Sequence, residues 1–478
     1  MSETANGANQ LRKNSLGLIA VTFMVISAAA PLTGVAGAMP LAFLLGNGTG
    51  VPATFIILTG VMLAFAAGYV AMSRHVTNAG AFYAYAARGL GGWAGGAVSV
   101  MALVSYNAMQ FGLIGLLGGA AAPTFAQFGL DLPWYVWSLI AILLVGILGY
   151  RQVDLSAKVL VVLVALEYLI VFVVDFAILG SGGAEGLSPG VLVDFGSVNT
   201  GSLATALLFC LGCFIGIEAT TIYGEEARNP ETTVPQATYL SVLLIGVFFI
   251  FTTWLMIAGS GASKVVETVG GMPDPTAYFF ELAGQYAGGT VANVAGLLFV
   301  SSIFAAVSAF HNYIARYSYV AGREGLLPAA FGQTHDSHQS PHIGSVTQTI
   351  GALIVLAIFA GLELDPILNM FTWISQIGTL GVLGMMAITS ISVIVFFRSQ
   401  AQGGAIQTLL LPLVAAAVMA WMFYYIYTNF GDLTGTTGGA LGWILPGLIP
   451  LGALVGLLLA MRLKAADPAA YARMGQNR

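Results

Sequence analysis

The chain has 478 residues, of which 58% are apolar and only 7% are charged, and its net charge is −5. Soluble domains carry about 25% charged residues, so this composition excludes a soluble globular domain and indicates an integral membrane protein. The acidic balance and the scattered positions of the basic residues exclude a nucleic-acid partner.

Apolar runs occur twelve times along the chain, and most are near the ~20 residues that a helix needs to cross a bilayer. They occupy residues 16–44, 51–73, 94–122, 133–149, 156–180, 200–224, 237–260, 287–318, 344–362, 366–397, 405–428 and 440–463. The sequence therefore predicts an all-α integral membrane protein with twelve transmembrane helices and no inserted soluble domain.

The basic residues indicate how these spans are oriented. With twelve spans and a cytoplasmic N-terminus, 14 of the 15 Lys and Arg residues fall on one side of the membrane, and only Lys264 falls on the other. Because loops rich in Lys and Arg stay in the cytoplasm, we expect both termini to be cytoplasmic. The expected location is the plasma (cytoplasmic) membrane, as a multi-pass protein.

Two spans are interrupted by small, polar or helix-breaking residues, at residues 25–34 and 212–219. Pro31 has no N–H and crowds the preceding turn, so it frees backbone groups in the first span. Unpaired backbone groups are costly in hydrocarbon unless they line a cavity and bind something. Interrupted helices at corresponding places in two halves indicate the binding site of a secondary transporter.

The two interruptions also divide the chain. Residues 16–180 would form a first repeat of five spans, and residues 200–397 a second repeat that five spans per half invert relative to the first. Residues 405–463 would then form two peripheral spans. Residues 1–15 and 464–478 are predicted to be cytoplasmic tails.

Several classes of protein and site are not supported by the sequence. The chain has no P-loop motif that would indicate ATP-driven transport, no metal-ligand cluster and no nucleophile elbow. Cys210 and Cys213 form a C-x-x-C pair inside an apolar span, which we interpret as ordinary packing residues. We therefore expect no enzyme activity, no cofactor and no metal.

Three motifs resemble those of the amino acid–polyamine–organocation (APC) superfamily of permeases. FIGIEAT at residues 214–220 leads into GEEARNP at 224–230, which resembles the most specific motif of that superfamily. RYSYVAGREGLLP at 316–328 resembles the end of its eighth span, and NAGAFYAY at 78–85 resembles the segment after its second span. The resemblance implies a LeuT-like fold: a five-plus-five inverted repeat whose discontinuous helices 1 and 6 hold the substrate.

The resemblance also assigns substrate-binding residues. In permeases of this type the carboxylate of an amino acid meets N–H groups of span one, and its amine meets carbonyl groups of span six, contacts that helix dipoles favour. The corresponding residues are Ser27, Ala28, Ala29, Ala30, Thr33 and Gly34 in span one, and Phe214, Ile215, Gly216 and Ile217 in span six. The first break departs from the common pattern and is similar to that of putrescine importers. A proline kink without a ligand is the alternative interpretation.

Glu218 and Glu167 lie within apolar spans, where a carboxylic acid indicates a functional site. Glu218 would carry a proton or pair with a substrate amine, or would be a neutral acid bonded to freed carbonyls. Glu167 stands where the resemblance places a buried lysine in some family members, between spans one, five and eight. It would release a proton inward, hold sodium with Ser302, or make a structural hydrogen bond. Asp175 is expected at the outer interface.

Other polar residues within the spans are secondary candidates. Three of them lie within about one turn of each other in span three, and they either line the pocket or join helices: Tyr106, Asn107 and Gln110. Ser301 and Ser302 are adjacent, so only one can face the centre, and the resemblance favours Ser302. His311 is a candidate proton relay, with an interhelical hydrogen bond as the alternative.

The gates are expected on both sides of the pocket. Phe214 is the expected aromatic lid, and the beginning of span ten is expected to contribute to the outer gate through Thr372, Trp373, Ser375 and Gln376. A charged loop either forms a cytoplasmic gate or is a solvated connector, and its candidate residues are Glu225, Glu226 and Arg228.

The sequence as a whole predicts a secondary active transporter that imports an amino acid by proton-coupled symport through alternating access. A polyamine or monoamine importer and an ion-independent exchanger are the alternatives, and sodium is the alternative coupling ion. A dication should require a second pocket acid beyond Glu218, and spans one, three and ten contain none. A receptor or a channel fits the pattern less well, since two isolated breaks make no continuous polar pore. The expected partners are a small amine-bearing solute and membrane lipid, in a monomer or homodimer.

Overall fold

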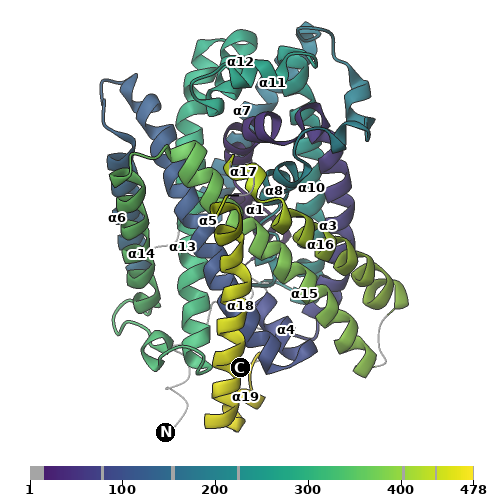
Figure 1. Cartoon of the computed structure of the whole chain (residues 1–478), viewed down its shortest axis with the longest axis vertical. Coiled ribbons are helices and arrows are strands. Elements are labelled where there is room, and N and C mark those ends of the chain that lie inside the picture. The colour runs from purple at the N-terminus through teal and green to yellow at the C-terminus, as the bar shows by residue number, and fades with distance from the viewer. Residues whose placement is uncertain are drawn as a thin grey trace.

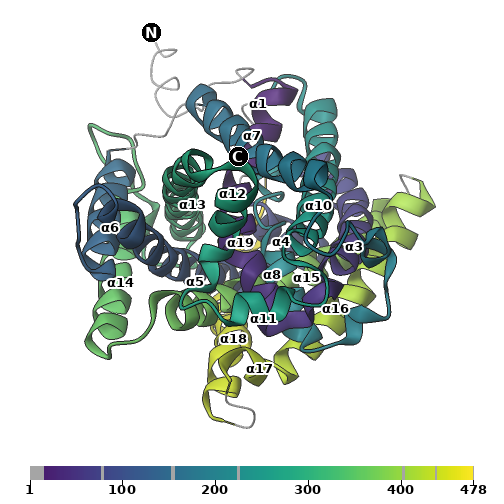
Figure 2. The same cartoon turned by 90° about the horizontal axis from the view of Figure 1, so that it is seen from above.

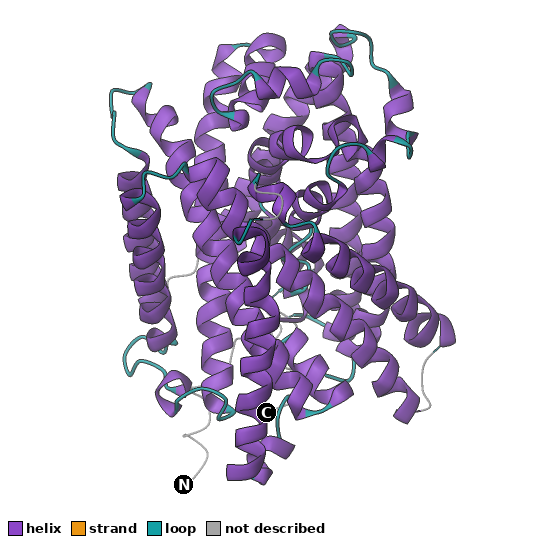
Figure 3. Cartoon of the chain, in the orientation of Figure 1, coloured by secondary structure: helices purple, strands orange, loops and turns teal. Residues whose placement is uncertain are grey.

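The computed structural model describes residues 16–76, 80–151, 157–222, 227–400, 404–435 and 439–476. Regular structure in these ranges is helical, apart from one isolated bridge between Leu16 and Ala227 (Figure 3). The helices bury their small and aromatic residues against one another, and connecting loops lie mainly at the two ends of the bundle.

The α-helices follow one another along the whole described chain (Figure 1). They are α1 (Leu18–Ala29), α2 (Met39–Leu41), α3 (Val51–Ser73), α4 (Phe82–Leu90), α5 (Gly92–Ala126), α6 (Trp134–Tyr150), α7 (Ala157–Ser181), α8 (Leu203–Gly212), α9 (Ala219–Ile222), α10 (Pro230–Ser260), α11 (Val265–Gly270), α12 (Tyr278–Ala287), α13 (Gly289–Arg323), α14 (His342–Gly361), α15 (Gln376–Gln400), α16 (Leu411–Thr428), α17 (Gly431–Thr434), α18 (Leu441–Ala466) and α19 (Pro468–Ala472). Wider π-helical stretches occupy Thr33–Ala38, Ala42–Asn47, Pro366–Ser375 and Ile406–Leu410.

Nine helical stretches within the described ranges are long and apolar enough to cross a membrane. The first of them, Leu18–Ser73, has 56 residues and contains α1, α2 and α3 with a sharp turn near Gly46 and Gly48. Two shorter apolar helices, α6 and α8, have 17 and 10 residues. The all-helical membrane class is confirmed, and the number of twelve spans stays a prediction.

The long helices run side by side along the long axis of the molecule (Figure 1). Helices α11 and α12 lie at one end, called here the α11–α12 end, and α4 and α19 lie at the other, called the α19 end. Seen along this axis, α8 lies near the centre, with α5, α13, α7 and α10 around it (Figure 2). Helices α6 and α14 pack together at the periphery.

The peripheral helices carry apolar side chains that other parts of the chain do not cover. Ile147 of α6, Ile354 of α14 and Leu454 of α18 are each more than half exposed, whereas the aromatic side chains of Tyr69 and Tyr106 are buried in the centre. An apolar outer surface of this extent is expected for a protein surrounded by lipid tails.

The first predicted interruption is present in the structure. Helix α1 ends because Ala30 adopts a left-handed conformation, with φ 46° and ψ 76°. Proline disfavours the right-handed α conformation in the residue before it, so Pro31 accounts for the end of the helix at Ala30. The chain then continues as the π-helical stretch Thr33–Ala38.

The second predicted interruption is also present. Helix α8 ends at Gly212, residues 213–218 form a series of turns, and α9 begins at Ala219. The turns are held by short-range bonds, such as that from the Phe214 N–H to the Leu211 carbonyl at 2.9 Å. Backbone N–H and C=O groups of this stretch therefore lack the i→i−4 partners that they would have in a continuous α-helix.

Candidate functional site

The two interruptions face each other across the centre of the bundle. A Cβ atom added to Gly216 would lie 3.0 Å from the Cβ of Ala28, and one added to Gly34 would lie 3.1 Å from the Sγ of Cys213. Gly216 also has a φ of 113°, which side chains other than that of glycine rarely tolerate. The structure thus brings spans one and six together at their predicted breaks.

A cavity of about 50 Å³ lies between the two interruptions. Its lining residues come from both breaks and from neighbouring helices: Ala28, Ala29, Ala30, Thr33, Gly34, Ala38, Met109, Leu113, Phe209, Gly212, Cys213, Ile215, Ala306, Phe310, Phe371, Ser375, Gln376 and Thr379. Among these described residues there is no Asp, Glu, Lys, Arg or His. A solute in this cavity would therefore meet backbone dipoles, hydroxyl groups, a thiol and an amide.

Glu167 joins three helices beside the first break. Its Oε2 atom accepts hydrogen bonds from the Leu32 N–H at 3.1 Å and from the Ser302 hydroxyl at 2.8 Å. Ser302 in turn accepts a bond of 2.9 Å from the Thr33 hydroxyl. Glu167 is only 3% exposed, and its carboxyl takes the place of the helical partner that the Leu32 N–H lacks. Spans one, five and eight meet here, as the family resemblance implies.

The carboxyl of Glu218 bonds to groups at and beside the second break. Its Oε2 accepts from the Gly216 N–H at 2.8 Å, and its Oε1 accepts from the Tyr106 hydroxyl at 2.9 Å. The hydroxyl of Tyr69 donates to the Glu218 backbone carbonyl at 2.9 Å. The carboxyl therefore binds a freed N–H group rather than a freed carbonyl, and it does not line the cavity.

The polar residues of span three point away from the cavity, which that span lines instead with Met109 and Leu113. Asn107 donates to the carbonyl of Leu103 in its own helix at 2.7 Å. The Gln110 amide donates to the Val307 carbonyl at 3.1 Å and lies 3.3 Å from Nδ1 of His311.

His311 lies between helices rather than at the cavity. Its Nε2 is 2.7 Å from the Ser345 hydroxyl, while its Nδ1 faces Gln110. The ring therefore joins α13 to α5 and α14. This geometry corresponds to the interhelical hydrogen bond that the sequence left open for His311.

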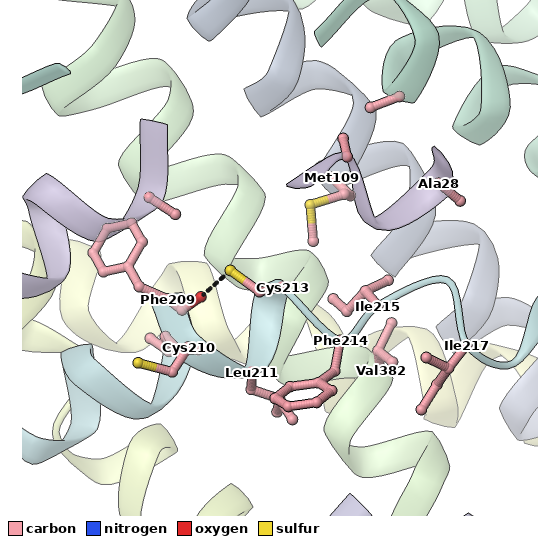
Figure 4. Packing of buried hydrophobic residues seen from close by; sticks show 14 of the residues in the cluster. Ala28, Met109, Phe209, Cys210, Leu211, Cys213, Phe214, Ile215, Ile217 and Val382 are labelled. Atoms are coloured by element: carbon pink, nitrogen blue, oxygen red, sulfur yellow. Dashed lines mark hydrogen bonds between the residues drawn. The ribbon is translucent and has the colours of Figure 1, made fainter. Parts of the chain in front are cut away.

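Phe214 does not occupy the position expected of a lid. Its ring packs against Phe55, with centroids 6.1 Å apart, and it is absent from the cavity lining. Figure 4 shows Ile215 directed toward Met109 while the Phe214 ring points the opposite way. The turns between α8 and α9 reverse the direction of successive side chains.

Three other phenylalanines do line the cavity: Phe209, Phe310 and Phe371. Phe209 of α8 and Phe371 of the π-helical stretch before α15 have ring centroids 6.5 Å apart. Trp373 is half-buried and does not reach the lining. Ser375 and Gln376, predicted for the outer gate, are lining residues.

The remaining predicted residues lie at the margins of the site. The Ser27 hydroxyl bonds to the Met24 carbonyl of its own helix at 2.7 Å, and Ile217 is buried outside the cavity. Arg228 is exposed, and its backbone N–H donates to the Leu16 carbonyl at 2.7 Å. Glu225 and Glu226 lie outside the described residues.

Asp175, which is expected at the outer interface, is not exposed to solvent. Asp175 is fully buried between α7 and α10, where its Oδ2 accepts a bond of 2.7 Å from the Thr252 hydroxyl. Its Oδ1 atom has no hydrogen-bond partner. Its nearness to the end of an apolar run suggested an aqueous position, but α10 covers it.

Sequence reasoning missed most of the apolar lining, including Met109, Leu113 and Phe310. The spacing of Met109 and Leu113, four residues apart on one helix face, was the available signal.

Two opposed broken helices around a cavity whose described lining is uncharged, in a bundle of membrane-length helices, are typical of a multi-pass membrane transporter. The family model described as amino acid permease matches residues 16–455, and the chain belongs to this family. Because it is a family of transporters, the expectation that the protein is not an enzyme is confirmed.

Characterised relatives transport different solutes. The low-affinity putrescine importer PlaP of Escherichia coli is 24% identical over 316 residues, which cover 64% of this chain and 67% of the relative. The branched-chain amino acid permease BcaP of Bacillus subtilis is 23% identical over 287 residues, covering 59% and 55%. The methylthioribose transporter of Bacillus subtilis is 23% identical over 372 residues, covering 77% and 72%.

Proposed function

We propose that the protein imports an amino acid by proton-coupled symport through alternating access. The observation that carries this proposal is the cavity between two opposed helix breaks, whose lining has no charged side chain among the described residues. An amino acid presents one positive and one negative group, which backbone carbonyl and N–H dipoles at helix ends can accommodate. Its side chain would occupy the apolar remainder of the cavity.

The proposed topology has twelve spans in two inverted halves. The 56-residue stretch Leu18–Ser73 would cross twice because it turns near Gly46, and α6 and α8 would each complete a crossing. The breaks in the first span and at α8–α9 would then occupy the first span of each half. The α19 end would face the cytoplasm, and the α11–α12 end would face the outside of the cell. Both termini would lie on the cytoplasmic side of the plasma membrane.

An amino acid fits the cavity better than a polyamine does. A dication without a carboxylate needs acidic partners, because burying an unpaired charge is costly. Glu167 and Glu218 are the buried acids beside the two breaks, yet neither of them lines the cavity. Putrescine, the solute named for one relative, is therefore the less favoured substrate.

Coupling would act through Glu167. In the closed arrangement the carboxyl is held by the Leu32 N–H and by Ser302. Movement of span one away from spans five and eight would separate these groups and admit water to the carboxyl. Water solvates the ionised form, so the proton would leave on the side that opens. The oxygens of Glu167, Ser302 and Thr33 could instead hold sodium, and the test below separates the two ions.

Glu218 would act by positioning rather than by carrying the proton. Its bond to the Gly216 N–H keeps residues 213–218 in their turns, and its bond from Tyr106 ties this stretch to span three. The buried hydroxyl of Tyr69 holds the same stretch from span two. Together these contacts would close the cavity toward the α19 end.

The outer lid would be formed by Phe209 and Phe371 in place of Phe214. Both rings line the cavity and contact one another across spans six and ten. Substrate binding would draw these rings together, and only contacts that are stronger in the closed state can drive the closure.

A thermal-shift screen of the purified protein tests the substrate class. A ligand at about 100 times its dissociation constant stabilises the folded state by about 2.7 kcal/mol, so at least one amino acid should raise the melting temperature. Ala306→Val narrows the cavity and should abolish this shift, whereas Ala305→Val, which alters a residue outside the lining, should retain it. Stabilisation by putrescine and by no amino acid would overturn the proposed substrate. A shift that needs sodium at constant pH would favour the sodium alternative.

A further inference from the structure

Gln376 is the one amide side chain that lines the cavity among the described residues. It is only 3% exposed, and its Oε1 atom has no hydrogen-bond partner. A buried carbonyl oxygen without a partner destabilises the folded state, so native proteins seldom retain one without a reason. At the wall of a substrate cavity, that reason is a donor supplied by the ligand.

The orientation of the amide is fixed by its neighbour Ser375. The Ser375 hydroxyl donates its proton to the Phe371 carbonyl at 2.6 Å, so its oxygen is left to accept. The Gln376 Nε2 group lies 3.4 Å from that oxygen and is the group that can donate to it. The acceptor Oε1 is therefore the end of the amide that stays unsatisfied.

The backbone directly before Gln376 is π-helical, as is part of span one. The π-helical stretch Pro366–Ser375 ends directly before Gln376, and the stretch Thr33–Ala38 lies on another wall of the same cavity. Widened helical turns of this kind occur frequently at functional sites. Gly112 of span three packs against the Ser375 backbone and fixes the position of this turn.

We propose that Gln376 selects the substrate by its side chain: Oε1 accepts a hydrogen bond from an amino acid that carries a neutral N–H or O–H donor, such as an amide or a hydroxyl. This inference rests on the proposed function, because it assumes that an amino acid occupies the cavity. Other lining residues, among them Met109, Leu113 and Phe310, offer only apolar contact. An aliphatic substrate of the same size would leave the Gln376 oxygen unpaired in the closed cavity.

The test compares isosteric pairs of amino acids by calorimetric titration of the purified full-length protein. Threonine should bind more tightly than valine, and asparagine more tightly than leucine, each by about 5- to 150-fold. Gln376→Met keeps the length of the side chain and removes both amide groups, so these ratios should fall to about one or invert. Because the substitution removes an unpaired buried oxygen, the ligand-free variant should melt at or above the wild-type temperature.

Gln348 of α14 provides a matched control. It is 2% exposed, both its amide atoms lack partners, and it is absent from the cavity lining. Gln348→Met should leave both ratios as in the wild type. Equal affinities within each pair for the wild type, or ratios that Gln376→Met leaves unchanged, would overturn this inference while the proposed function stands. Failure of every amino acid to bind would overturn the proposed function itself.

Discussion

Pro31 and Glu167 illustrate how one residue creates a need that another satisfies. Pro31 ends the regular helix, and the N–H group of Leu32 loses its partner within the chain's own helix. The carboxyl of Glu167, 135 residues further along the sequence, accepts from that N–H and from Ser302. Binding of a proton or an ion to Glu167 would therefore directly alter its hydrogen bond to the backbone of the first break.

Two adjacent serines allow this network to be tested. Ser302→Ala removes a donor to Glu167 and the acceptor for Thr33, so it should cost about 1–3 kcal/mol of stability and reduce gradient-driven uptake. Ser301→Ala is the matched control, because the Ser301 hydroxyl bonds only to the Leu298 carbonyl of its own helix in the described contacts. Thermal melting and proteoliposome uptake measure both effects. Equal losses in the two variants would contradict the assigned role of Ser302.

Gly216 combines a left-handed backbone with a close approach between the two breaks. Gly216→Ala should therefore destabilise the protein by about 1–3 kcal/mol and abolish substrate binding, since the added methyl group would press on Ala28. Gly60→Ala is the control, because nothing lies within 4 Å of a Cβ at this exposed position of α3. It should leave binding unchanged and alter stability slightly. Binding that survives Gly216→Ala at full affinity would show that the breaks need not meet there.

The sequence allowed the residues that break helices to be identified, but not the directions of side chains beside them. Pro31 and Gly216 act locally, so their effect is readable from the chain alone. Phe214 is predicted to be the lid because the break should leave its ring near the ligand, yet the turns direct it toward Phe55. The helical period that predicts which residues share a face has no meaning in residues 213–218.

At the scale of elements, the site is built from parts that are weakly hydrogen-bonded. The turns between α8 and α9 and the π-helical stretches Thr33–Ala38 and Pro366–Ser375 surround the cavity. The helices outside them, such as α5 and α10, are continuous for 35 and 31 residues. We therefore expect the central elements to move more readily than these continuous helices.

Hydrogen exchange should detect this difference between elements. We expect the amides of residues 213–218 to exchange faster than those in the middle of α10, because turn bonds open more readily than helical ones. A bound amino acid should slow the exchange of residues 213–218 and leave α14 unchanged. Mass spectrometry of peptic fragments measures both. Uniform protection in the absence of substrate would contradict a mobile break.

The sequence predicted the order of the helices along the chain better than it predicted which helices contact one another. The position of Asp175 near the end of an apolar run suggested contact with water, but α10 packs over it and supplies Thr252. Such a contact joins residues 77 positions apart, and hydrophobic patterns within one span contain no information about it. By contrast, the meeting of Glu167 with Ser302 followed from the family resemblance.

At the scale of the whole molecule, the distribution of basic residues predicts which end faces the cytoplasm. Ala184 lies exposed in the segment after α7, and Asp336 lies exposed in the segment before α14. In intact cells, a membrane-impermeant maleimide should label Ala184→Cys but not Asp336→Cys, which should react only after permeabilisation. Both native cysteines are buried, so they should contribute little background. The reverse labelling pattern would contradict the proposed orientation.

Proton coupling in the whole molecule would depend on a single buried group, the carboxyl of Glu167. Glu167 and Asp175 lie on the same helix and are both buried, but only Glu167 is bonded to the first break. Replacing Asp175 by its amide therefore removes a buried titratable group, whereas replacing Glu167 by its amide also removes the proposed coupling site.

The most direct measurement is amino acid uptake into proteoliposomes driven by an imposed proton gradient, compared with exchange of the same amino acid without a gradient. Glu167→Gln should lose accumulation against a concentration difference and retain exchange, whereas Asp175→Asn should retain both. Full gradient-driven accumulation by Glu167→Gln would contradict the proposed coupling through Glu167.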